Sequence, residues 1–259
     1  MDHISYTQLN MLTRCGEQYR RRYIEGEVIP PSAALVRGRS CHKANEKNFK
    51  QKVETDTDLP KDEVLSAFSD EWESGRYGIA WTEEELGTDS PSTAEGRWKD
   101  SGVRLLSVYH EEQSPLVHPV TVEDPFRVEF HGSFPALTGI VDRITREGII
   151  EDDKFVSKSP SAGDIETDLQ MTVYDLGHRV KYGNPPKGLC KRFAVDTKVA
   201  KTVYQVTVPR ENEVIDRLLF RTERALDAVA KGVFLPPPSG SWWCSKRFCG
   251  YWTTCKVKP

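Results

Sequence analysis

The chain has 259 residues, a formal net charge of −3 and 37% hydrophobic residues. No apolar run approaches the roughly 20 residues of a membrane-spanning helix, and the N-terminus lacks the basic start and apolar stretch of a signal peptide. We therefore expect a cytoplasmic globular protein without a membrane partner, whose overall charge does not make it a general polyanion binder.

The first part of the chain has helical periodicity, which predicts helices over 5–24, 37–52, 61–75 and 96–113, with a loop at 83–95. After Pro115 the pattern changes to alternation, which predicts strands over 118–130, 137–145 and 148–156. The remaining segments are predicted as a helix over 162–180, a hairpin over 190–199 and 201–208, a helix over 211–232 and an irregular run over 235–243. This order predicts one α/β domain over residues 1–259, with a mixed central β-sheet flanked by helices.

The stretch "GIIEDDKFV" (148–156) carries three acids and a lysine on a predicted strand. Asp152 and Lys154 share one face of that strand. A three-residue hairpin loop over 146–148 would place Asp142 directly across from Asp152. Two opposed carboxylates repel unless one is protonated or a cation lies between them. The pair therefore predicts a site for a hard divalent cation, with Lys154 available to neutralise charge or to orient a water. The alternative is a surface hairpin with solvated charges.

A family resemblance rests on the order of these residues. Asp142, the Asp152-x-Lys154 motif and the helix motif Q-x-x-x-Y of Gln170 and Tyr174 resemble the PD-(D/E)XK nuclease superfamily. More narrowly, they resemble RecB-like exonucleases, which include phage members and the iron–sulfur nucleases of CRISPR adaptation. The upstream segment "RGRSCHKANE" is similar to the G-x-x-x-H helix of that family.

The resemblance implies a restriction-endonuclease-like core and a role for each matching residue. The implied metal ligands are His42, Asp142, Asp152 and the backbone carbonyl of Asp153. Lys154 would be the catalytic lysine, and Gln170 and Tyr174 would position the DNA strand or that lysine. The implied function is a Mg²⁺- or Mn²⁺-dependent DNA exonuclease acting on single strands or duplex ends, in recombination, repair or phage DNA processing.

The C-terminal segment "CSKRFCGYWTTC" (244–255) holds three cysteines in twelve residues, which favours a metal cluster over packing. A tetrahedral thiolate site needs four ligands. The resemblance supplies the fourth, because one N-terminal cysteine of that family joins three C-terminal ones around a [4Fe–4S] cluster. The implied ligands are Cys15, Cys244, Cys249 and Cys255. Zinc would satisfy the same thiolates, and free reduced cysteines are a further alternative.

Such a cluster would tie both ends of the chain to the core. It would also bring the arginines of "RCGEQYRRRY" (14–23) and the aromatic residues of 242–252 to one side as a DNA-binding face. Three other functions stay open: a non-catalytic iron–sulfur or zinc module that binds nucleic acid, a nuclease working inside a CRISPR adaptation complex, and a zinc-stapled structural protein.

Overall fold

The computed structural model describes residues 2–132 and 134–258, and a six-stranded mixed sheet lies at its centre. The strands are β1 (His3–Ser5), β2 (Pro119–Val128), β3 (Ala136–Thr145), β4 (Ile149–Val156), β5 (Gly188–Val195) and β6 (Lys201–Thr207). Their order is β1-β3-β4-β5-β6, with β2 also paired to β3. The β1–β3 and β4–β5 pairs are parallel and the others are antiparallel. The predicted α/β class with a mixed sheet is confirmed.

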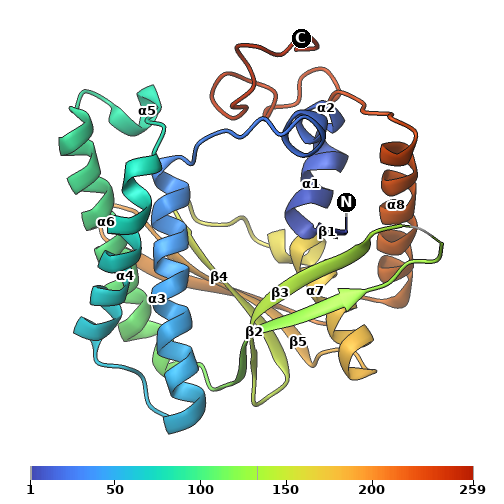
Figure 1. Ribbon diagram of the computed structural model, residues 1–259. Helices are drawn as coiled ribbons and strands as arrows, with labels where there is room; N and C mark the ends of the chain where they lie inside the picture. Colours follow the sequence, from blue (N-terminus) through green and yellow to red (C-terminus); the bar gives the residue numbers. More distant parts are fainter. Residues whose placement is uncertain (1, 133, 259) are drawn as a thin grey trace.

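Helices cover both faces of this sheet (Figure 1). The α-helices are α1 (Tyr6–Arg14), α2 (Gly16–Tyr19), α3 (Ala33–Thr55), α4 (Lys61–Gly75), α5 (Glu83–Leu86), α6 (Pro91–Glu112), α7 (Leu169–Tyr182) and α8 (Asn212–Ala230). Helices α3, α4 and α6 gather on one side and α1, α7 and α8 on the other (Figure 1). In the chain outside positions 1, 133 and 259, no helix is long and apolar enough to cross a membrane.

The alternation of β4 creates two hydrophobic cores, one on each face. Ile150 joins the core formed with α1, α7 and α8, which includes Met171. Phe155 joins the core formed with α3, α4 and α6, which includes Trp72. Because successive strand residues point to opposite faces, the polar residues between Ile150 and Phe155 are divided between the two sides as well.

The predicted helix over 5–24 is wrong in one respect, because Cys15 interrupts it. Cys15 has extended backbone angles (φ −158°, ψ 100°), ends α1 and caps α2. A π-helical turn over Arg20–Ile24 follows α2. At this corner the Gly16 N–H donates to the Leu235 carbonyl at 2.7 Å, and a Cβ on Gly16 would lie 2.7 Å from the Leu235 nitrogen. The break therefore lets the C-terminal segment pack beside α2, where Figure 1 also shows it.

Three further boundaries differ from the predictions because capping residues decide them. Helix α3 begins after Ser32 rather than near residue 37. The predicted loop at 83–95 contains α5 and the start of α6, where Ser90 is the N-cap and Pro91 occupies the first turn. Helix α7 begins only after Asp168, whose side chain accepts from the Met171 N–H.

The ring of Phe126 on β2 fixes how α7 lies on the sheet. A Cβ added to Gly177 of α7 would approach that ring to 2.4 Å, and one added to Gly139 of β3 would do the same. Tyr174 meets the ring edge-to-face, with centroids 6.2 Å apart. The two glycines therefore let α7 approach closely enough to bring its polar face to β4.

Candidate active site

The β3–β4 hairpin has the predicted register. Arg143 pairs with Glu151 and Ile144 with Ile150. The loop closes through Gly148, whose φ is +77° and whose N–H donates to the Thr145 carbonyl at 2.9 Å. Continuing the register by one residue sets Asp142 opposite Asp152.

Asp142 lies where β1 and β4 separate along one edge of β3. We call this place the β3–β4 fork. β2 occupies one edge of β3 along most of its length. The other edge is shared, because β1 pairs with Ala136–Thr138 and β4 with Arg143–Ile144. Asp142 lies between these two pairings, and its Oδ2 accepts the Asp153 N–H at 3.1 Å. The two carboxylates therefore meet where the strands separate.

Asp152 is almost fully buried, with 1% of its side chain exposed. Its Oδ1 accepts from Gln170 Nε2 at 2.9 Å, and the same nitrogen lies 2.8 Å from the Tyr174 hydroxyl. Lys154 Nζ lies 2.6 Å from Asp152 Oδ2 as an ion pair. Within residues 2–132 and 134–258, however, that oxygen accepts no aligned hydrogen bond. This oxygen therefore has the Lys154 ammonium as its close partner.

The electrostatic environment moves the two carboxyl pKa values in opposite directions. Burial raises the pKa of Asp152, Lys154 opposes this, and Asp142 adds to it. Burial also acts to raise the pKa of Asp142, but the hydrogen bond and charge of His42 outweigh it and the pKa is lowered. The charge repulsion that the sequence predicts is therefore present, and a bound cation would relieve it.

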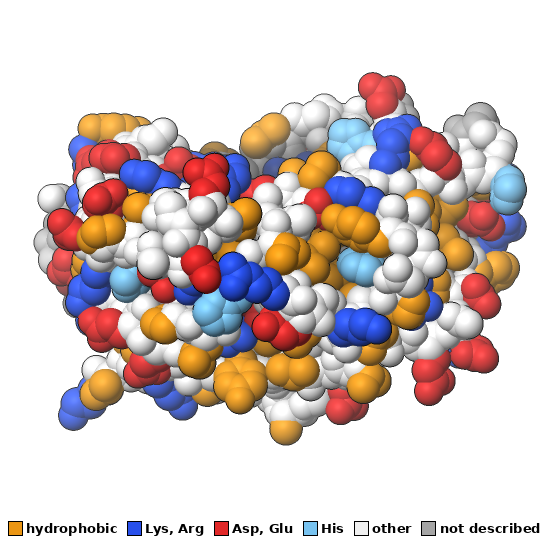
Figure 2. Space-filling model, turned by 90° about the horizontal axis from the view of Figure 1, so that it is seen from below, with side chains coloured by type: hydrophobic (Ala, Val, Ile, Leu, Met, Phe, Trp, Pro, Cys, Tyr) orange, Lys and Arg blue, Asp and Glu red, His pale blue; other side chains and the backbone are white. Residues whose placement is uncertain are grey.

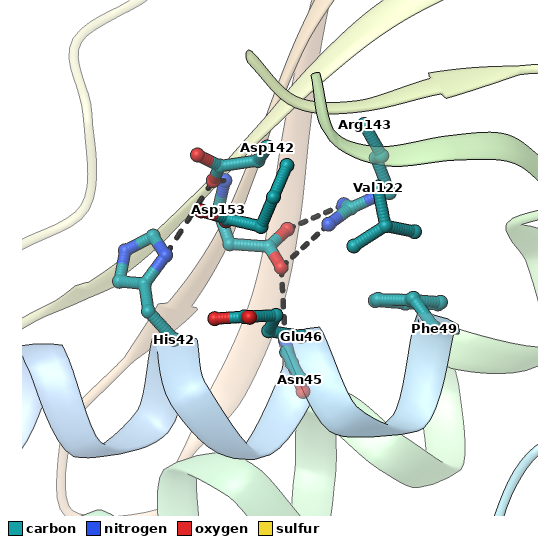
Figure 3. Close-up of a pocket in the computed structure, with 9 residues that line it drawn as sticks. His42, Asn45, Glu46, Phe49, Val122, Asp142, Arg143 and Asp153 are labelled. Carbon is teal, nitrogen blue, oxygen red and sulfur yellow. Dashed lines mark hydrogen bonds and ion pairs between the residues drawn. The ribbon is translucent and has the colours of Figure 1, made fainter. Parts of the chain in front are cut away.

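His42 reaches the site from α3. Its Nδ1 lies 3.4 Å from Asp142 Oδ2, and Figure 3 shows the imidazole facing that carboxylate. The pocket beside it is also lined by Glu46 and Glu123. Neither is among the site residues predicted from the sequence. Glu46 is one helical turn after His42, so the spacing H-x-x-x-E was the available signal. Glu123 has φ +55°.

A buried ionic network supports the hairpin from the opposite face. Arg143 donates to Glu151 Oε2 at 2.9 Å, to Asp153 Oδ2 at 2.7 Å and to the Tyr109 hydroxyl at 2.9 Å. Asn45 donates to the same Asp153 carboxylate at 2.9 Å, as Figure 3 shows. The Asp153 side chain is thus fully engaged, and only its backbone carbonyl can serve a metal. This role of Arg143 was not predicted from the sequence.

No group of three or more His, Cys, Asp or Glu residues in the described ranges is arranged to hold a metal ion as it stands. The donors at the hairpin nevertheless suit one. Asp142 and Asp152 supply oxygen ligands, which hard divalent cations prefer, and the Oδ2 atom of Asp152 is buried.

The structure brings the four predicted cysteines together. Cys15, Cys244, Cys249 and Cys255 line one pocket between α2 and the C-terminal segment. The Gln18 N–H donates to Cys15 Sγ at 3.4 Å, and Gln18 Nε2 lies 4.0 Å from Cys249 Sγ. The other two cysteines, Cys41 and Cys190, are buried elsewhere.

Of the four arginines in the DNA-binding face expected around Cys15, Arg20 and Arg21 have acidic partners. Arg20 pairs with Glu17 and Glu25, and Arg21 pairs with Glu27. Figure 2 shows the side of the molecule away from α2, where acidic and basic side chains are interspersed rather than gathered by sign. Of the aromatic residues, Trp242 is 63% exposed whereas Tyr251 is only 3% exposed, so stacking on bases is open to the first and not to the second.

Comparisons with known proteins bear on the family of this chain. The family model described as "PD-(D/E)XK nuclease superfamily" matches residues 3–256. A crystal structure from Eubacterium rectale, described as "Putative exonuclease", is similar over 95% of this chain and 87% of its own, with 12% identity and a TM-score of 0.54. The crystal structure of SSO0001 aligns over 100% and 87%, with 13% identity and a TM-score of 0.44. No curated protein sequence matches. Since the family model covers almost the whole chain, the protein belongs to the PD-(D/E)XK nuclease superfamily.

Proposed function

We propose that the protein is a metal-dependent DNA exonuclease and that the whole chain acts as one nuclease domain. The observation that carries the proposal is the meeting of Asp142 and Asp152 across the β3–β4 fork, with Lys154 Nζ 2.6 Å from Asp152. The resemblance of these motifs to RecB-like exonucleases, and a structural neighbour described as an exonuclease, support exonucleolytic action.

The residues that would hold Mg²⁺ or Mn²⁺ are His42, Asp142, Asp152 and the Asp153 carbonyl. When bound, such an ion polarises the phosphate and lowers the pKa of a water. In the reaction, the water oxygen forms a bond to phosphorus, the ester P–O bond breaks, and the leaving oxygen takes up a proton to become a hydroxyl.

The chain's own groups assist this hydrolysis through charge and orientation. Burial acts to lower the pKa of Lys154, but Asp152 and Asp142 outweigh it and the pKa is raised. Lys154 is therefore an ammonium, whose protons can bond a non-bridging phosphate oxygen and stabilise its charge. Gln170 holds Asp152 Oδ1 at 2.9 Å and so keeps Oδ2 turned toward the fork, while Tyr174 anchors Gln170.

The test is cleavage of end-labelled linear DNA and of closed circular single-stranded DNA in Mg²⁺ or Mn²⁺. We expect linear DNA to be degraded from an end and the circle to survive. Asp152→Asn keeps the shape but loses the charge, and should slow cleavage by about 10²-fold or more. Asp227→Asn, on exposed α8, is the matched control and should leave the rate unchanged.

Two results would redirect the proposal. Cleavage of the circle would make the protein an endonuclease. DNA binding without cleavage, unaffected by chelators, would favour the non-catalytic binding module.

We further propose that Cys15, Cys244, Cys249 and Cys255 hold a [4Fe–4S] cluster, with zinc as the alternative. The shared pocket supports this, as does the Gln18 N–H directed at Cys15 Sγ, since such bonds tune cluster sulfurs. The cluster would join the two ends of the chain and stabilise the fold.

The cluster proposal is tested by measuring iron, sulfide and zinc in anaerobically purified protein. Cys249→Ser should lose the metal and Cys41→Ala, whose thiol is buried away from the pocket, should keep it. Equal metal content in both variants, or none in the unaltered protein, would contradict the assignment.

A further inference from the structure

A groove of about 240 Å³ has Lys154 in its lining but neither Asp142 nor Asp152. Its lining comes from β4, β5, β6 and the segment before α7, and its charged and amide residues are Lys154, Lys158, Asp164, Asp168, Lys191 and Gln205. We call it the lysine groove. Three of its residues are lysines, and one of them is the proposed catalytic residue, so the groove continues directly from the reaction centre.

Strand register explains why the groove follows the site. Asp152 on β4 pairs with Lys191 on β5, and Lys191 pairs with Gln205 on β6. These three residues form a row across the sheet. Because neighbouring strands lie about 4.8 Å apart, Lys191 is one strand and Gln205 two strands from the carboxylate. The sheet itself therefore sets a track leading away from Asp152.

The acidic residues of the lysine groove are already occupied. Asp164 Oδ2 accepts the Ser161 N–H at 2.7 Å. Asp168 accepts the Met171 N–H at 2.9 Å and forms an ion pair with Lys191. An ammonium carries three protons, so Lys191 keeps donors for another anion.

Two polar groups of the groove lack partners in the described parts of the chain. Lys158 is exposed and has neither a hydrogen bond nor an ion pair there. The Oε1 atom of Gln205 is buried and accepts no hydrogen bond, while its Nε2 donates to the Ser161 carbonyl at 2.6 Å. The lysine groove thus offers unused cationic donors and one unused acceptor.

Two acidic residues lie on the opposite side of the reaction centre. There Glu46 and Glu123 line the pocket beside His42 and Asp142. Of these, Glu46 is paired with Lys43 and Lys50. A phosphodiester is therefore attracted chiefly on the side of Lys158, which has no acidic partner among the described residues.

We propose that the lysine groove binds the phosphate next to the scissile one on the substrate strand, with Lys191 and Lys158 as its cationic ligands. The inference rests on the proposed nuclease function. The volume is below the roughly 300 Å³ of pockets that enclose drug-sized ligands, which suits a sugar-phosphate unit whose base lies outside.

The experiment measures binding of single-stranded oligonucleotides in EDTA, where no divalent ion supports cleavage. Each oligonucleotide carries one uncharged methylphosphonate linkage, moved stepwise along the strand. The proteins are the unaltered chain, Lys158→Ala, Lys191→Met and the control Lys187→Ala, an exposed lysine just before β5. Cleavage of unmodified strands in Mg²⁺ identifies the scissile linkage.

We expect the uncharged linkage beside the scissile one to weaken binding to the unaltered protein about tenfold, the loss of one charge-assisted contact. Lys158→Ala and Lys191→Met should bind less tightly and be insensitive to that linkage. For Lys158→Ala, the slope of log affinity against log salt should fall by about 0.7. Lys187→Ala should behave as the unaltered protein.

The outcomes distinguish an error in the groove assignment from an error in the proposed nuclease function. If the unaltered protein cleaves DNA but both groove variants keep its salt slope and its sensitivity to the uncharged linkage, the groove assignment is wrong and the nuclease stands. If the protein binds DNA and yields no product in Mg²⁺ or Mn²⁺, the proposed function falls, and the position next to a scissile phosphate falls with it. Lys158 is exposed, so its variant gives an answer even if Lys191→Met fails to fold.

Discussion

Replacing Arg143 by methionine tests whether the buried network supports the active-site hairpin. Arg143 is 2% exposed and bonds Glu151, Asp153 and Tyr109. Its guanidinium also lies 4.5 Å from the ring centroid of Phe49. In the variant, Glu151 keeps Arg192 at 2.7 Å, but Asp153 loses its ion pair with the Arg143 guanidinium.

Breaking a buried ion pair by removing one partner costs about 3–5 kcal/mol. The total free energy of unfolding of a domain is about 5–15 kcal/mol, so the loss is a large fraction of it. For a chain of this size, each kcal/mol moves Tm by about 2–4 °C. We therefore expect Arg143→Met to lower Tm by about 6–20 °C.

The stability loss of Arg143→Met should also depend on pH in a definite direction. Burial acts to raise the pKa of Asp153, but Arg143 outweighs it and the pKa is lowered in the folded protein. The pair therefore stabilises the fold above the unfolded pKa of about 3.9, and this stability is lost as pH falls through the folded value. Without Arg143, burial raises the pKa of Asp153, so the variant is penalised more at pH 7 than at pH 4.5.

The assay is urea denaturation of both proteins at pH 7 and pH 4.5, with Arg192→Met as the matched control. Arg192 is less buried and shares Glu151 with Arg143, so its loss should cost less. A loss below about 1 kcal/mol for Arg143→Met, or a loss that is equal at the two pH values, would refute the reasoning.

Three further predictions follow from contacts described above. Gln170→Ala should lower kcat by about 10–100-fold with an unchanged Tm, because Gln170 orients the Asp152 carboxylate; an unchanged kcat would remove it from the site. Gly177→Ala should lower the free energy of unfolding by about 1–3 kcal/mol, because its methyl group meets the ring of Phe126. Gly96→Ala has open space around it and should instead raise the free energy of unfolding by about 0.5–1 kcal/mol. Urea midpoints that shift in the same direction for both variants would contradict this prediction. Burial raises the pKa of Cys41 and Cys190 to about 12, so about one thiol in 10⁴ is ionised at pH 8. Both cysteines should therefore resist alkylation by iodoacetamide. Rapid alkylation of either one in the folded protein, mapped by mass spectrometry, would show that it is not buried.

The hairpin that carries the site could be predicted because its determinants are local. Alternation along 137–145 and 148–156 sets the faces, and Gly148 sets the turn, so the opposition of Asp142 and Asp152 follows from counting residues. The approach of Gln170 is less local, yet the period of one helical turn to Tyr174 indicated which face of α7 would meet the strand.

The features that sequence reasoning missed depend on packing between distant elements. Arg143 looks like a solvated strand charge until α3 and α6 cover it with Asn45 and Tyr109. The adjacency of Lys191 to Asp152 arises only after α7 crosses between β4 and β5, and no local pattern specifies which strands become neighbours. The break at Cys15 likewise depends on the C-terminal segment that packs against Gly16.

The central claim is that Lys154 acts on a phosphodiester bound at the β3–β4 fork. The most direct measurement is the single-turnover rate of end-labelled DNA degradation in Mg²⁺ for the unaltered protein, Lys154→Ala and the exposed control Lys187→Ala. The account predicts degradation by the unaltered protein and the control, and a rate lower by about 10²-fold or more for Lys154→Ala with DNA binding retained. Equal rates for all three proteins would show that the fork is not the catalytic centre.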